Sequence, residues 1–306
     1  MKILAVLTGG TIGSVIHDGY IYTDEDAKKL VINNYIDRFD NDVEFEIVEP
    51  FTVHSENLSN KEINKLVEVV CDSLSKNYDG IIVTHGTDSL QFSASALSFA
   101  VGNTQTPVLL VSAQYPMADF RSNGQVNFNG AVDFIKNKKG TGVYVAYSNG
   151  NEKVEFHQGN RVIMFNEADD KVYSLPPVIV KSALGKYELK ENSETLVVTI
   201  SPGAVYNCNL DNIKAIILRP YHSGTVNIKS QEFLDFIKQA KQKNIPVYLV
   251  NLKDGVSYEG VREYKNAGID ILPFCSFPSI YMKAWIGNSM ECDFDKFMKT
   301  SIAGEF

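Results

Sequence analysis

The stretch GIIVTHGTDSL, residues 80–90, decides the fold. Its apolar run, residues 81–83, is typical of a strand buried on both faces, as in parallel sheets covered by helices. The run ends abruptly in hydroxyl, imidazole and carboxylate side chains: Thr84, His85, Thr87 and Asp88. Asp88, with Gln91 three residues later, either caps the next helix or lies at a ligand site beyond the strand. The two roles are compatible.

Buried strands and helices alternate on both sides of this stretch. Strands are predicted over 2–7, 44–53, 107–113 and 142–148, and helices over 59–77, 89–102 and 124–137. The helix over 59–77 opens with a Ser-x-x-Glu capping box and repeats apolar residues at helical spacing. The alternation predicts an α/β fold with a large N-terminal, mostly parallel sheet that has helices on both faces.

A domain boundary is predicted near residue 190. The segment at about 165–195 is polar, contains prolines and lacks periodicity, which is typical of a linker. Smaller strands and a helix over 230–243 follow it. We therefore expect an N-terminal α/β domain over 1–190, which carries the candidate site, and a smaller C-terminal α/β domain over 191–306.

The amino-acid composition excludes several classes of partner and site. The chain has 306 residues, a formal net charge of −8 and no cluster of lysines and arginines, so neither nucleic acid nor an anionic membrane surface is an expected partner. Its four cysteines are scattered and its histidines lack metal-ligand spacing, so we expect no metal site and no disulfide framework. The N-terminal apolar run is too short for a signal peptide or a membrane span, which favours a cytoplasmic setting.

Ligands of open parallel sheets bind beyond the carboxyl ends of the strands. Four expected strands end in small, polar or glycine residues: TGGTIG (8–13), HSENL (54–58), THGTDS (84–89) and SAQYP (112–116). TGGTIG has neither the Rossmann glycine spacing nor the lysine of a Walker loop, and alone it is more typical of an ordinary turn. His85 is predicted to be a packed residue rather than a catalyst. Together, the four strand ends favour a ligand site at one rim of the sheet.

Four motifs occur together in the order found in a known family. TGGTIG, GYIY (19–22), HGTD (85–88) and FRSNGQVNFNGA (120–131) resemble the bacterial-type L-asparaginase family, most closely its cytoplasmic type I branch. The resemblance covers most of residues 1–165 and is weaker beyond. It implies hydrolysis of the side-chain amide of a small amino-acid substrate, asparagine, to a carboxylate and ammonia, without metal or cofactor. It also implies a homodimer or homotetramer.

The resemblance implies a role for each motif residue. Thr11 would be the nucleophile, which needs a polarising partner because a threonine hydroxyl is weakly nucleophilic at neutral pH. Tyr20, in a polar loop over 14–26 that resembles a closing lid, would be that partner. Thr87 and Asp88 would form the second part of the catalytic machinery. Further substrate contacts would come from Gly10, Ser55, Glu56, Gly86 and the backbone of Ala113.

One position departs from the family. A lysine there would reach Thr87 and Asp88 to complete a Thr–Lys–Asp relay, but the register set by GNR (159–161) puts Met164 at this place. Methionine has nearly the volume of a lysine stem, without its charge or its N–H donors. We expect a pocket that binds its ligand and a reaction that is impaired.

Two alternatives to an impaired enzyme stay open. In the first, the chain is an amino-acid-binding or sensing protein on the same fold. In the second, it is an unrelated α/β ligand-binding protein, and its motifs are ordinary turns.

The apolar segment 273–285 is predicted to be either a subunit interface or a core strand. It holds no acidic residue where the family's neighbouring subunit supplies a carboxylate.

Overall fold

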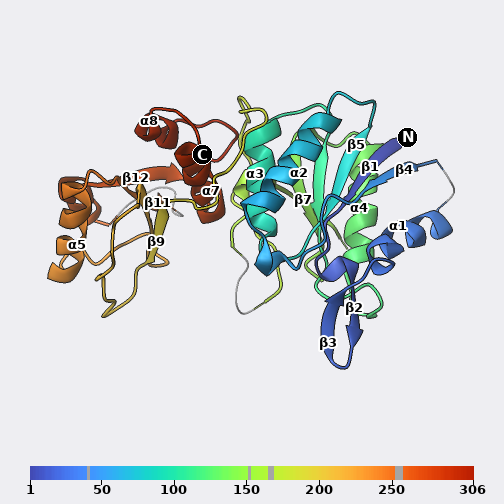
Figure 1. Ribbon diagram of the computed structural model, residues 1–306, viewed down its shortest axis with the longest axis horizontal. Helices are drawn as coiled ribbons and strands as arrows, with labels where there is room; N and C mark the ends of the chain where they lie inside the picture. Colours follow the sequence, from blue (N-terminus) through green and yellow to red (C-terminus); the bar gives the residue numbers. More distant parts are fainter. Residues whose placement is uncertain (40–41, 151–152, 165–168, 252–257) are drawn as a thin grey trace. The chain divides into compact units, whose positions relative to one another are not determined.

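The chain folds into two compact units. The computed structural model describes residues 1–39, 42–150, 153–164, 169–251 and 258–306. The first unit comprises Met1–Tyr187 with Ile302–Gly304, and the second comprises Glu188–Ser301 with Glu305–Phe306. Figure 1 shows the chain coloured from its N-terminus, in blue, to its C-terminus, in red. Residues 302–304, which a single division near 190 assigns to the second domain, cluster with the first unit.

A six-stranded sheet of order β4-β1-β5-β6-β7-β8 forms the centre of the first unit. Its strands are β1 (Lys2–Leu7), β4 (Glu44–Val48), β5 (Gly80–Thr84), β6 (Val108–Val111), β7 (Val143–Tyr147) and β8 (Glu155–Gln158). The first five run parallel, and β8 is antiparallel to β7. All five residues of β5 are buried, as the apolar run at 81–83 predicted.

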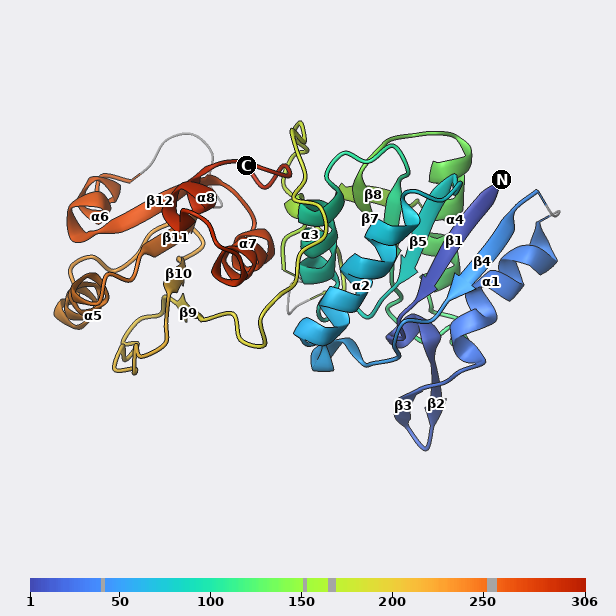
Figure 2. The same ribbon diagram turned by 45° about the horizontal axis from the view of Figure 1, so that its top comes forward.

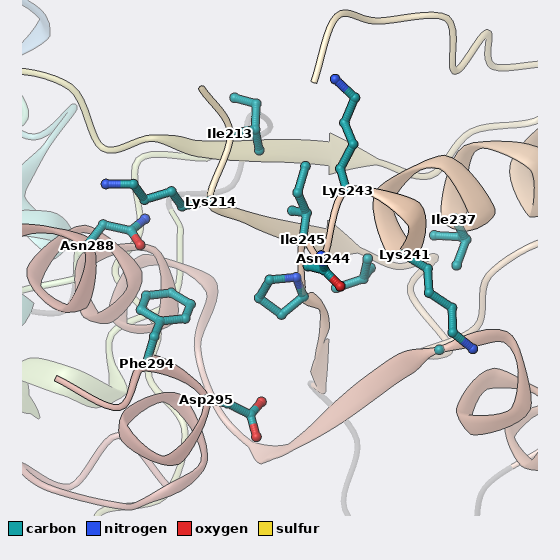
Figure 3. Close-up of a pocket in the computed structure, with 13 residues that line it drawn as sticks. Ile213, Lys214, Ile237, Lys241, Lys243, Asn244, Ile245, Asn288, Phe294 and Asp295 are labelled. Atoms are coloured by element: carbon teal, nitrogen blue, oxygen red, sulfur yellow. The ribbon is translucent and has the colours of Figure 1, made fainter. Parts of the chain in front are cut away.

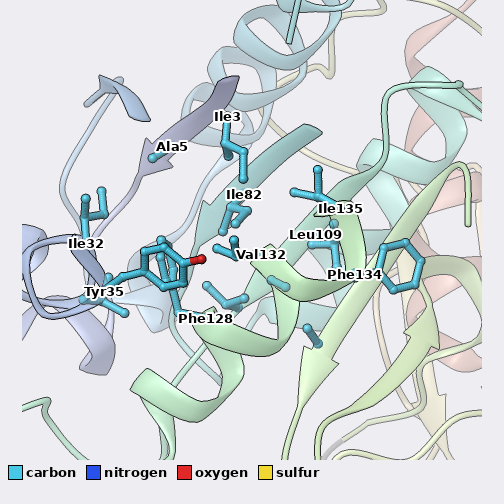
Figure 4. Packing of buried hydrophobic residues seen from close by; sticks show 14 of the residues in the cluster. Ile3, Ala5, Ile32, Tyr35, Ile82, Leu109, Phe128, Val132, Phe134 and Ile135 are labelled. Carbon is cyan, nitrogen blue, oxygen red and sulfur yellow. The ribbon is translucent and has the colours of Figure 1, made fainter. Parts of the chain in front are cut away.

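Helices cover both faces of this sheet, as the sequence predicted (Figures 1 and 2). They are α1 (Ala27–Arg38), α2 (Asn60–Ser73), α3 (Leu90–Val101) and α4 (Gly124–Lys136). The capping box of α2 forms between Ser59 and Glu62. Alternate residues of β1, Ile3, Ala5 and Leu7, pack with side chains of α1 and α4, because successive side chains of a strand point to opposite faces. Figure 4 shows Ile3 and Ala5 on the side of the sheet that faces these helices.

The segment 14–26, which the sequence analysis treats as a loop, contains a β-hairpin. Strands β2 (Ser14–His17) and β3 (Tyr20–Thr23) pair antiparallel across a two-residue turn. Both turn residues, Asp18 and Gly19, have positive φ values, of 51° and 80°. An Asp-Gly pair between two short strands is a strong signal for such a hairpin, so the sequence contained the evidence.

The second unit holds a smaller parallel sheet of order β12-β11-β10-β9. The strands are β9 (Thr195–Thr199), β10 (Ala215–Arg219), β11 (Val247–Asn251) and β12 (Ile269–Phe274), and the helices are α5 (Gln231–Gln242), α6 (Val261–Ala267), α7 (Phe277–Ser289) and α8 (Phe294–Lys299). The prediction of a core strand over 273–285 was wrong, and the alternative of a subunit interface stays a prediction. Most of this segment is helix α7, and its Ile280 and Ala284 are buried in the core of the unit.

A buried ion pair fixes the end of the chain within the second unit. The ammonium group of Lys283 pairs with the carboxylate of Glu305, and both side chains are fully buried. Lys283 also donates to the carbonyl oxygen of Thr300, at 2.6 Å. Burial lowers the pKa of Lys283, and the carboxylate of Glu305 opposes that shift. Removing one member would therefore leave a buried charge without its partner.

We expect Glu305→Gln to lower the free energy of unfolding by about 3–5 kcal/mol, the usual cost of breaking a buried ion pair. The control is Lys243→Gln, which breaks the exposed pair of Lys243 with Asp211. This control should cost less than about 1 kcal/mol because exposed pairs contribute little. Urea unfolding measures both values, and equal losses would contradict the expectation.

Candidate functional site

The carboxyl ends of β1 and β5 meet through two glycines. Leu7 of β1 lies beside Thr84 of β5 in the parallel register, so the two strands end at the same level. Gly10 follows β1 with a φ of 74°, and a Cβ atom there would overlap the backbone of Gly86. The turns after the two strands therefore touch, with no side chain between them at this point.

Ser55 joins this contact from a third segment. It begins a 3-10 turn, Ser55–Asn57, and is buried. A Cβ atom at Gly86 would overlap its side chain. The Ser55 hydroxyl accepts from the backbone N–H of Asp88, at 3.2 Å, and lies 3.4 Å from the Asp88 carboxylate, to which it donates. Three of the sequence motifs thus converge at one place.

The two threonines follow the touching glycines directly. Thr11 begins the 3-10 turn Thr11–Gly13 after Gly10, and Thr87 follows Gly86. Both threonines are half-buried, whereas Asp88 is exposed. Two hydroxyls and an exposed carboxylate thus lie at the rim of the sheet, and convergent polar groups of this kind can orient a small polar ligand.

Asp88 does not cap the next helix, so that alternative was wrong. Helix α3 begins at Leu90 with Ser89 at the N-cap position, and no side chain forms a capping bond there. The Gln91 side chain donates instead to the backbone carbonyl of Asp88, at 3.0 Å. The hydrogen bond of the Asp88 carboxylate with Ser55 leaves this carboxylate at the rim.

Met164 reaches the same place from the far end of the first sheet. The turn Gly159–Arg161 packs on α3, where a Cβ atom at Gly159 would overlap Ser98 and the carbonyl of Ala94. The chain then approaches the start of α3, and the sulfur of Met164 lies 3.3 Å from Nε2 of Gln91. Gln91 therefore contacts both Met164 and the backbone of Asp88.

The other predicted site residues lie around this centre with fewer contacts to it. Tyr20 is on β3 of the hairpin and is 69% exposed. The residue after the hairpin, Asp24, donates its backbone N–H to Gly13 of the turn that starts at Thr11. Glu56 follows Ser55 and is exposed, and Ala113 is fully buried after β6. Among the residues that the structure describes, none of these three is hydrogen-bonded to Asp88, which pairs with Ser55 and Gln91.

His85 is packed beneath the rim, as the sequence analysis predicted. It is 1% exposed, and its Nδ1 donates to the carbonyl oxygen of Gly86, at 2.8 Å. Burial lowers the pKa of His85, and the hydrogen bond to Gly86 only partly opposes this. The imidazole is therefore neutral at pH 7 and serves to hold the backbone of the HGTD segment.

Lys28 was missed by the sequence analysis. Its ammonium group is buried and binds Glu49, Glu25 and the hydroxyl of Thr52, each at 2.7–2.8 Å. Burial lowers its pKa, but the two carboxylates outweigh burial and raise it overall. The stem packs under Gly13, so the cluster supports the turn that starts at Thr11. One sequence signal could have identified Lys28: it lies among the apolar residues that recur at helical spacing along α1 and form its buried face.

The described residues include no group of three or more His, Cys, Asp or Glu side chains that could hold a metal ion. A pocket of about 700 Å³ lies in the second unit and contains none of the motif residues. Lys214 and Lys243 line it but pair with Glu194 and Asp211, each at 2.6 Å. Their amino ends, and that of Lys241, point in different directions (Figure 3), so positive charge does not gather in this pocket.

Fold and site together define a two-unit α/β protein with polar side chains gathered at the carboxyl ends of parallel strands, where ligands of such sheets bind. A family model described as "Asparaginase, N-terminal" matches residues 2–176, more than half of the chain. The chain belongs to the asparaginase family. Among the described helices, none combines the length and the apolar character that crossing a membrane requires.

Relatives carry the same family name. L-asparaginase 1 of Escherichia coli (strain K12) is 30% identical over 203 residues, which cover 59% of this chain and 58% of the relative. The chain thus spans less than two thirds of that relative. L-asparaginase of Thermococcus kodakarensis is 26% identical over 74% of this chain and 76% of its own. The solved structure of L-asparaginase I from Vibrio cholerae has a TM-score of 0.80 at 22% identity, covering 100% of this chain and 98% of its own, and shows the fold.

The close packing of Gly86 against Ser55 can be tested by its effect on stability. We expect Gly86→Ala to lower the free energy of unfolding by about 1–3 kcal/mol, because the new methyl group would displace Ser55. The control is Gly260→Ala, since a Cβ atom at Gly260 meets open space. It should change stability by less than about 0.5 kcal/mol. Urea unfolding of the two variants measures this, and equal effects would show that the close approach is absent.

Proposed function

We propose that the chain is an L-asparaginase-type amidohydrolase that converts L-asparagine to L-aspartate and ammonia, with its turnover limited by Met164. The convergence of Gly10, Gly86, Ser55 and Asp88 at one rim is the observation that carries the proposal. Family membership supports the reaction class, because several relatives are named L-asparaginase. The setting proposed on the same basis is a cytoplasmic homodimer or homotetramer, without metal or cofactor.

In the proposed first half-reaction, the Thr11 oxygen attacks the amide carbon of the substrate. When the hairpin closes, the Tyr20 hydroxyl accepts the Thr11 proton as it gives its own proton to the departing nitrogen, which leaves as ammonia. Backbone N–H groups of the glycine turn stabilise the negative oxygen of the intermediate. The product of this half-reaction is an ester between Thr11 and the aspartyl group.

In the second half-reaction, water cleaves the ester near Thr87 and Asp88 and releases aspartate and the free Thr11 hydroxyl. The family's lysine would supply the proton relay for this step. Methionine at 164 has no ionisable group, so water activation loses the assistance that general acid–base catalysis provides, typically ~10²–10⁴-fold. The second half-reaction is therefore the slow one in this chain.

Substrate recognition is proposed to be independent of residue 164. The Asp88 carboxylate accepts from the α-ammonium group, which takes over from Ser55 as its donor, and the freed Ser55 hydroxyl with the backbone near Gly86 donates to the α-carboxylate. Glu56 stands beside them, and the backbone of Ala113 and Gly10 lines the amide pocket. An amino acid needs an acceptor and donors at separate places, and the hydrogen bond between Ser55 and Asp88 holds the two kinds of group side by side.

A second candidate is a protein that binds or senses an amino acid without turnover. It is favoured by Met164 itself, since a site that needs only to bind has no use for the lysine relay. The two candidates differ in one observable property, the release of ammonia from asparagine by the native chain.

We expect Met164→Lys to raise kcat for asparagine by about 10²-fold with little change in kcat/KM, because the cation speeds cleavage of the ester, which raises kcat and KM together, and leaves ground-state binding as it is. Steady-state ammonia release measures this. Met290→Lys, at a position in the second unit that is 39% exposed, is the control and should leave the rate unchanged.

Three outcomes would contradict this proposal. If the native chain already works at the rate of the lysine variant, then Met164 is not the relay position. If neither protein releases ammonia and neither binds asparagine or glutamine in a calorimeter, the rim has a different ligand. Binding by the native chain without ammonia release from either protein would support the sensing alternative.

A further inference from the structure

The side chain of Gln91 links the aspartate of the HGTD segment to the position of the missing lysine. Gln91 is fully buried in the first turn of α3. Its Nε2 atom donates to the carbonyl oxygen of Asp88 at 3.0 Å and lies 3.3 Å from the sulfur of Met164. One amide group therefore contacts both the backbone of Asp88 and the side chain at position 164.

The neighbours of this amide fix its orientation. A backbone carbonyl oxygen is only an acceptor, and a thioether sulfur is a weak acceptor. Turning the amide by 180° would set its own oxygen against both of them. Nε2 therefore faces Asp88 and Met164, while Oε1 is buried and has no partner among the residues that the structure describes.

A lysine at position 164 would meet the donor side of this amide. Its stem would put a methylene group in place of the sulfur, so that Nε2 of Gln91 would lose its second acceptor. The lysine ammonium has N–H donors and no acceptor, so it cannot accept a hydrogen bond from Nε2. The partial positive charge of the amide N–H groups also repels a nearby cation. Methionine and lysine at 164 thus require different residues at 91.

We propose that Gln91 is a positioning residue matched to Met164. It holds the Asp88 backbone from the side where residue 164 approaches, and it limits what a cation at 164 can contribute to turnover. This inference rests on the amidohydrolase function proposed above. Replacing Gln91 by a residue without N–H donors should help the lysine variant and should not help the native chain.

The test compares kcat and KM for asparagine in four proteins: native, Met164→Lys, Gln91→Ala and the double variant. We expect the double variant to exceed Met164→Lys by about tenfold in kcat, with kcat/KM within about threefold, a total gain inside the usual range of acid–base assistance. Gln91→Ala alone should not raise kcat. A double variant no faster than Met164→Lys would overturn the proposal.

A matched control comes from Gln125 on α4. Its Nε2 also donates to a backbone carbonyl, that of Val31, at 3.1 Å, and its Oε1 is likewise without a partner among the described residues. Met164→Lys combined with Gln125→Ala should have the kcat of Met164→Lys alone. An equal gain from Gln125→Ala would show a general effect of removing a glutamine, and this would also overturn the proposal.

Urea unfolding of the same four proteins tests the pairing without activity. We expect Met164→Lys to lower the unfolding midpoint less in the Gln91→Ala background than in the native one, because residues in contact have coupled effects. If none of the proteins releases ammonia, the proposed function fails, and this coupling alone decides the inference. Equal shifts in the two backgrounds would overturn it.

Discussion

The close approach of Gly10 to Gly86 is the contact on which the rest of the site depends. β1 and β5 are parallel neighbours, so the turns that follow them leave the sheet at the same level. Without a Cβ atom on either glycine, the two turns touch, and Ser55 can pack on Gly86 and bind Asp88. Larger residues would push the segments that carry Thr11 and Thr87 apart. Gly10 and Gly86 are therefore both needed for the same steric reason: a side chain on either one would separate the two turns.

Strands buried on both faces could be predicted from the sequence because they are continuous apolar runs, as in β5 and β6. The hairpin over 14–23 was harder because its large apolar side chains, among them Tyr20 and Ile21, are exposed and so do not mark a buried face. Helix α7 was missed because it is apolar on most sides, which removes the helical period that would have identified it.

The site itself was predicted only in part, because its hydrogen bonds join residues that are far apart in the sequence. Two segments have the capping pattern, and only Ser59 with Glu62 forms the box. Asp88 fails to cap because Ser55, 33 residues earlier in the chain, bonds with its carboxylate, and no local pattern encodes that contact. The role of Gln91 is equally invisible in sequence, since its contact with Met164 spans 73 residues.

Titration calorimetry of L-aspartate tests amino-acid recognition at this rim most directly. The native chain should bind aspartate, and Asp88→Asn, which keeps the shape of the side chain and removes its charge, should weaken binding by about tenfold or more. The reason is that a hydrogen bond between charged groups is worth ~1.5–3 kcal/mol. Native binding that Asp88→Asn leaves unchanged, or no binding by the native chain, would contradict recognition of an amino acid by Asp88.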